Sequence, residues 1–116
     1  MAKPYLTDLR ALLDRLAPLA GLEQAIDCKH FFSGAAAYVE GRIFMSLTPT
    51  GLALKLPPAR REALLAAGGR PLRYFPKAPI KTDYVLLAEE TAKDDRALAP
   101  LIAEGLRFCL AAGAQS

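Results

Sequence analysis

The residues that could do chemistry by their type and spacing begin with a Cys-x-His pair, Cys28 and His30, which Asp27 precedes. A metal site needs three or four convergent ligands. On a strand, Cys28 and His30 share one face, whereas Asp27 points to the other. We therefore expect a buried thiol beside a surface imidazole, and no bound metal.

Three further patterns resemble fragments of active sites. Ser33-Gly34 lacks the Gly-x-Ser-x-Gly context and the following helix of a nucleophile turn. The acid pairs Glu89-Glu90 and Asp94-Asp95 suit a solvated loop and a helix start better than a shielded acid/base pair. The glycines match no phosphate-binding motif. The sequence therefore predicts no enzyme, with no catalytic, cofactor-binding or metal-binding residues and no cofactor.

A basic segment is the candidate site for nucleic-acid binding. Between positions 51 and 81 the only acid is Glu62, and the bases are Lys55, Arg60, Arg61, Arg70, Arg73, Lys77 and Lys81. Basic side chains that meet phosphates release counterions, and Tyr74 and Phe75 are aromatics within the segment. The sequence favours a solvated charged surface over nucleic-acid binding for this segment, because the net charge is only +3.

Helical periodicity is clearest at the two ends of the chain. A helix is predicted over 5–19, with Leu6, Leu9, Leu13 and Leu16 on one face and its end at Pro18 and Gly21. A second is predicted over 94–112, interrupted or started late by Pro100. Its inner stripe is Leu98, Leu101, Ile102, Gly105, Leu106 and Cys109.

Between them the pattern is extended from about Lys29, with a meander of strands over 35–39, 42–47 and 52–56. Turns at Glu40-Gly41 and 48–51 predict the pairs Tyr38–Ile43, Ala36–Met45, Leu47–Leu52 and Met45–Leu54. One face, expected to pack on helices, then holds Ala36, Tyr38, Ile43, Met45, Leu47, Leu52, Leu54 and Leu56. The other holds Ala37, Val39, Phe44, Ala53 and Lys55. Val39 and Phe44 are therefore candidate interface residues, although a bulge would exchange the faces.

The remaining elements complete an α+β fold. Pro57-Pro58 opens a helix over 59–67, which Gly68-Gly69 ends, and strands follow over 72–75 and 83–87 with a polar connection at 89–93. The predicted order is α-β-β-β-α-β-β-α, an antiparallel sheet with helices mainly on one face. We expect a single domain over 1–116, without signal peptide or membrane span, in the cytoplasm with both cysteines free.

Several residues resemble the N-terminal domain of the TfoX/Sxy competence regulators. The family's Met-Phe-Gly-Gly-x-Gly-x-Tyr stretch, with its following Gly and Phe, is matched at Phe32, Gly34, Tyr38, Gly41 and Phe44. Ser33 and Ala36 replace two of its glycines. The resemblance extends over 52–55, 66–68, Tyr74 and Tyr84, and implies the same fold and a regulatory theme. The YjbR-like small proteins are similar in element order.

The expected function is a non-enzymatic regulatory domain that acts through protein surfaces, with an unknown protein partner or a second copy of itself. The alternative is a nucleic-acid-binding accessory protein that uses the segment 55–81. No membrane partner is expected.

Overall fold

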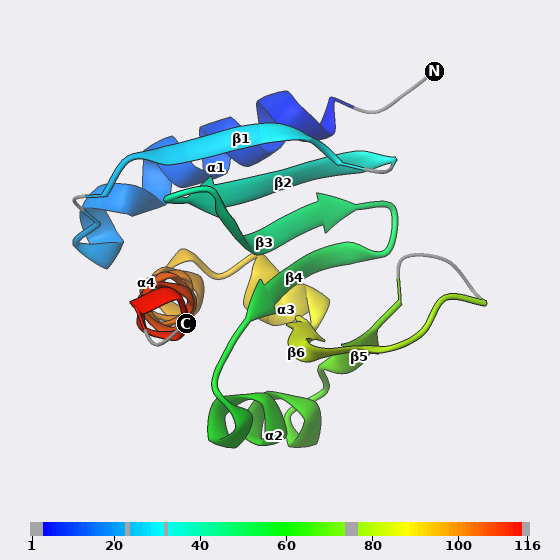
Figure 1. Ribbon diagram of the computed structural model, residues 1–116. Coiled ribbons are helices and arrows are strands. Elements are labelled where there is room, and N and C mark those ends of the chain that lie inside the picture. The colour runs from blue at the N-terminus through cyan, green and yellow to red at the C-terminus, as the bar shows by residue number, and fades with distance from the viewer. Residues whose placement is uncertain (1–3, 23, 32, 74–76, 115–116) are drawn as a thin grey trace.

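A computed structural model describes residues 4–22, 24–31, 33–73 and 77–114 of the chain. The helices are α1 (Tyr5–Ala20), α2 (Pro58–Ala66), α3 (Glu89–Ala92) and α4 (Asp95–Ala114). The strands are β1 (Ile26–Phe31), β2 (Gly34–Val39), β3 (Arg42–Thr48), β4 (Gly51–Lys55), β5 (Arg70–Leu72) and β6 (Lys81–Leu86), shown in Figure 1. The predicted α+β class is confirmed.

The strands form one antiparallel sheet in the order β1-β2-β3-β4-β6-β5 (Figure 1). The first four strands follow the chain as a meander, and β6 lies between β4 and β5. The Glu40-Gly41 turn has positive φ at both residues, which a two-residue hairpin loop between twisted strands requires. The sheet edges are β1 and β5, and β5 is short and carries Pro71.

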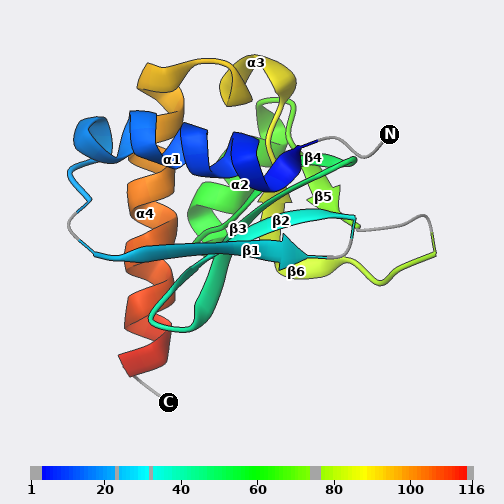
Figure 2. The ribbon, with the colours of Figure 1, turned by 90° about the horizontal axis from the view of Figure 1, so that it is seen from above.

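The helices α1 and α4 pack on the same face of the sheet and cross each other there (Figure 2). The predicted inner stripe of α4 is buried in full, and Leu9, Leu13 and Leu16 of α1 are buried beside it. A bidentate ion pair joins the helices, with Arg15 Nε and Nη2 donating to the Asp95 carboxylate at 3.0 and 3.2 Å. Gly105 lets α4 approach β4 closely, because a Cβ there would stand 2.9 Å from the carbonyl oxygen of Lys55.

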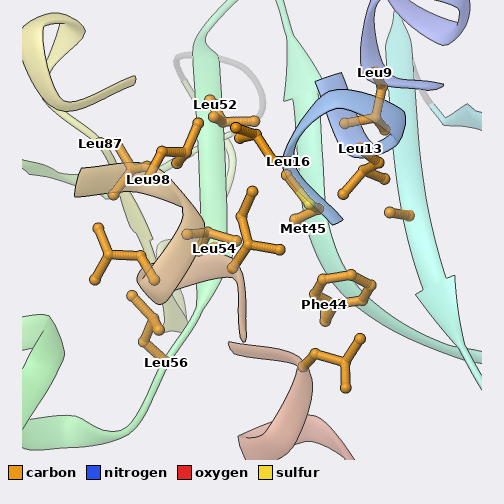
Figure 3. Close-up of a cluster of buried hydrophobic side chains, with 14 of the residues drawn as sticks. Leu9, Leu13, Leu16, Phe44, Met45, Leu52, Leu54, Leu56, Leu87 and Leu98 are labelled. Carbon is orange, nitrogen blue, oxygen red and sulfur yellow. The ribbon is translucent and has the colours of Figure 1, made fainter. Parts of the chain in front are cut away.

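A β-bulge at Phe44 corrects the predicted faces of the sheet. Tyr38 pairs with Ile43 as expected, but the next pair is Ala37 with Met45, so the predicted Ala36–Met45 pair is wrong. The extra residue lets both Phe44 and Met45 point into the core beneath α1 and α4, in the same buried cluster as Leu9, Leu13, Leu16 and Leu54 (Figure 3). Ala35, Ala37 and Val39 also join this core.

The expectation that Val39 and Phe44 lie on the sheet face opposite the helices, where another segment or subunit would cover them, is therefore wrong. Both side chains are 0% exposed within the monomer. Between β3 and β4 no bulge intervenes, and the predicted pairs Met45–Leu54 and Leu47–Leu52 are confirmed.

Four elements also differ from expectation. The strand β1 precedes the predicted meander, and α3 replaces a polar connection. The fourth predicted strand begins two residues early, at Arg70, and ends at Leu72, while β6 begins at Lys81. Across the described residues, none of the helices combines the length and apolar character that a membrane crossing requires.

Candidate functional site

The seven basic residues of the candidate segment are divided by the fold. On α2, Arg60 Nε donates to Glu104 Oε1 of α4 at 2.7 Å, and Arg61 Nη1 lies 3.6 Å from Asp83 Oδ1 and donates to the carbonyl of Thr82. Their charges are thus matched by carboxylates. Lys55, half-buried on β4, lies opposite Tyr84 of β6.

The other four bases, Arg70, Arg73, Lys77 and Lys81, lie on β5, at the start of β6 and in the connection between them. All four are exposed, and none forms an ion pair with a described residue. Arg73 Nη1 donates a long hydrogen bond, 3.4 Å, to the carbonyl of Ala78. Tyr74 and Phe75 lie outside the described residues.

Arg70 and Arg73 line one cleft of about 360 Å³ at the edge of the sheet. Its other lining residues are Pro49 and Thr50 of the β3–β4 turn, Pro71 and Leu86. The turn is fixed by a 2.7 Å hydrogen bond between the Thr48 and Thr50 hydroxyls and by donation from the Thr50 amide to Thr48 Oγ1. The lining therefore combines two guanidinium groups with a hydroxyl and an apolar floor.

The Cys28–His30 pair does not form a reaction centre. Cys28 is half-buried and packs against the core, whereas His30 is exposed near the end of the edge strand β1. Burial raises the pKa of the Cys28 thiol, and the nearby Arg10 guanidinium only partly opposes this. A cavity of about 350 Å³ between α1 and β1 includes Cys28 among its lining residues, with Arg10 and Asp14. Within the described ranges, His, Cys, Asp and Glu form no group of three that could hold a metal ion.

A groove that the sequence did not predict lies between α2, α3 and α4. Its volume is about 750 Å³, and its lining residues are Pro57, Arg60, Leu64, Thr91, Ala97, Pro100, Leu101, Glu104, Arg107 and Phe108. Although α2 lies beside the sheet, none of its residues is fully buried (Figure 1). The Arg60–Glu104 ion pair joins α2 to α4 along this groove.

The model of the TfoX N-terminal domain family matches residues 15–109, which is most of the chain. The chain belongs to this family. No match was found among curated proteins.

The fold explains several of the residues that resemble the TfoX motif. A Cβ on Gly34 would stand 2.2 Å from the carbonyl oxygen of Leu47 and 2.7 Å from Thr48 Cα, so only glycine fits there. Gly41 closes the β2–β3 turn at φ +76°, and Phe44 forms the bulge. Of the other motif positions, Phe32 and Tyr74 lie outside the described residues. These TfoX residues therefore serve the hairpin and the core.

The two residues that replace glycines of the TfoX motif, Ser33 and Ala36, differ in burial. Ser33 is exposed in the β1–β2 turn. Ala36 is fully buried and pairs with Lys29 on one side and Ser46 on the other. Two residues further along this strand, Tyr38 lies under the Lys29 ammonium, whose Nζ is 5.1 Å from the ring centroid.

Proposed function

We propose that this TfoX-family chain is a non-enzymatic regulatory domain that binds an apolar segment of a partner protein in the groove between α2 and α4. The observation that carries the proposal is a groove of mixed, mainly apolar lining beside a helix that buries none of its own residues. Grooves of this kind receive amphipathic segments in many recognition domains. The regulatory theme comes from the resemblance to competence regulators.

The way α2 is attached supports a binding role for this groove. Leu64 faces the groove and only partly contacts the core, and Leu65 is 41% exposed on the same helix. The helix is joined to its neighbours by the ion pairs of Arg60 and Arg61. Partly exposed ion pairs contribute only about 0–1 kcal/mol each. These ion pairs therefore oppose a small change in the separation of α2 and α4 only weakly, and the contact of Leu64 with the core is the larger restraint.

The chemistry of the lining indicates what kind of segment fits. Pro57, Leu64, Pro100 and Phe108 supply apolar surface for one or two large side chains. Arg107 is exposed in the same lining and forms no ion pair within the described part of the chain. A partner segment with apolar anchors and one carboxylate would complement both features.

A site-specific photo-crosslinker at position 64 tests the proposal. The full chain is expressed in its native host with the crosslinker at Leu64 and, as the control, at Leu19, which is 64% exposed on α1. We expect a discrete adduct with a partner protein only from position 64, unchanged by nuclease treatment. The Arg107→Glu substitution should reduce the yield several-fold, because it places a like charge against the partner's carboxylate.

The same experiment separates a foreign partner from self-association. Adducts of twice the chain mass, together with a concentration-dependent mass in light scattering, would assign the groove to a second copy. Equal adducts from positions 64 and 19 would show nonspecific contact and contradict the proposal.

A further inference from the structure

We infer that the cleft lined by Arg70 and Arg73 binds phosphate groups of a nucleic-acid strand. This inference is independent of the α2–α4 groove, which lies on other elements. It retains only four of the seven basic residues of the sequence-based candidate, namely Arg70, Arg73, Lys77 and Lys81.

The contrast between the two groups of arginines is the first argument. Arg60 and Arg61 each meet a carboxylate, at 2.7 and 3.6 Å. Arg70 and Arg73 share one cleft whose lining contains no acid. Two guanidinium groups that face one small space repel each other unless an anion lies between them. A planar guanidinium group can donate bidentate hydrogen bonds to two oxygens of one phosphate.

The other lining residues suit a phosphate on an organic ligand. The Thr50 hydroxyl is held in the cleft wall by Thr48, so it adds a positioned polar group. Pro49, Pro71 and Leu86 add some apolar surface to a mostly polar lining, so that a sugar or base can rest beside the phosphate. The volume of about 360 Å³ has room for one nucleotide unit.

The continuation of positive charge identifies a chain of phosphates rather than a single one. Lys77 is exposed in the β5–β6 connection and Lys81 at the start of β6, where it lines a separate cleft with Glu62 and Asp83. In the sequence, no acid occurs between Glu62 and Asp83. Asp83 itself already pairs with Arg61. A free phosphate would need only the cleft, whereas exposed bases that follow the cleft residues along the chain can meet further phosphates of a strand.

Salt dependence of binding measures these contacts directly. The assay is fluorescence anisotropy of a labelled twelve-nucleotide oligothymidylate with the full chain. Four phosphate contacts predict that affinity falls about 50-fold between about 50 and 200 mM salt, from a slope of roughly −0.7 per contact. Removing two contacts in the Arg70→Ala/Arg73→Ala double variant should reduce this fall to about 7-fold.

Matched variants separate the site from net charge and from misfolding. The Arg42→Ala/Arg96→Ala variant loses the same charge at exposed positions elsewhere and should keep the 50-fold dependence. The Arg70→Lys/Arg73→Lys variant should bind more weakly with a similar salt dependence, because lysine preserves the charge but cannot form bidentate hydrogen bonds. Circular dichroism checks that each variant is folded.

Equal salt slopes in the two alanine double variants, or no binding at low salt, would overturn the inference. Pyrophosphate that competes as well per molecule as the oligonucleotide would assign the cleft to small phosphates and overturn the strand assignment.

Discussion

Replacing Gly34 with alanine tests the packing that positions the β2–β3 hairpin. Gly34 does not need positive φ, so alanine can adopt its backbone conformation, and the penalty is purely steric. The new methyl group would stand 2.2 Å from the Leu47 carbonyl oxygen and 2.7 Å from Thr48 Cα. Both atoms belong to the backbone of β3, so the strands must separate at this end.

The magnitude follows from two contributions. Overpacking costs about 1–3 kcal/mol, and each weakened hydrogen bond of the strand pair adds about 1 kcal/mol. We expect the free energy of unfolding to fall by about 3–4 kcal/mol. The control is Gly41→Ala, where no atom lies within 4 Å of the new methyl group but φ is +76°. Its cost is the strain of the left-handed conformation alone, about 1–2 kcal/mol.

Urea unfolding followed by circular dichroism gives both values. With a slope of about 2 kcal/mol per molar urea, Gly34→Ala should lower the midpoint by about 1.5–2 M and Gly41→Ala by about 0.5–1 M. A Gly34→Ala variant as stable as the Gly41→Ala control would refute the steric reasoning and the register of the hairpin with it.

Three further predictions concern the core, a helix start and the thiols. Phe44→Ala should lower the free energy of unfolding, measured by urea unfolding, by about 3–5 kcal/mol, because the side chain is fully buried. A loss below about 1 kcal/mol would mean that Phe44 lies at the surface. Asp94→Ala should lower the free energy of unfolding, measured by thermal unfolding, by about 1 kcal/mol, because Asp94 Oδ1 accepts hydrogen bonds from the amides of Arg96 and Ala97. The control Asp8→Ala removes no such cap and should lower it less. Burial raises the pKa of the Cys28 thiol, so its alkylation at neutral pH should be slower than that of a free thiol. The alkylation rate should keep rising at pH values above the pKa of an ordinary thiol. Arg10→Ala removes a charge that lowers this pKa, so it should slow the alkylation further.

The same shift gives stability a defined dependence on pH. Burial raises the pKa of both Cys28 and Cys109 above their unfolded values, so the folded state holds its protons to higher pH. The resulting stabilisation is complete below the unfolded thiol pKa and is lost as pH rises through the folded values. Unfolding midpoints should therefore decline in the alkaline range, and replacing both cysteines with alanine should remove that part of the decline.

Periodicity predicted the elements in which the spacing of nearby apolar residues alone shows which face is buried. The stripes of α1 and α4 repeat every three or four residues, and β3 and β4 are joined by a short regular turn, so both helices and the pair Met45–Leu54 were predictable. The strand β1 was missed because it is an edge strand with Asp27, Lys29 and His30 exposed, which weakens its apolar pattern.

The bulge and the groove depend on information that is not local. Whether Phe44 is an extra residue in its strand is decided by how β2 and β3 share the core under α1, and the alternation of one strand alone does not contain this. The α2–α4 groove depends on Arg60 and Glu104, which are 44 positions apart. By contrast, the unmatched bases Arg70 and Arg73 lay within the predicted basic segment, and only their separation from Arg60 and Arg61 required the structure.

The position of α4 has a consequence for the chain during its synthesis. This last helix covers β3 and β4, which leave the ribosome much earlier, and it also braces α1 through Asp95. At about 5–20 residues per second, its 20 residues take roughly 1–4 s to be made. Throughout that interval the part of the leucine-rich side that α4 will cover stays open to water, so nascent chains stalled before Asp95 should be the species that chaperones retain.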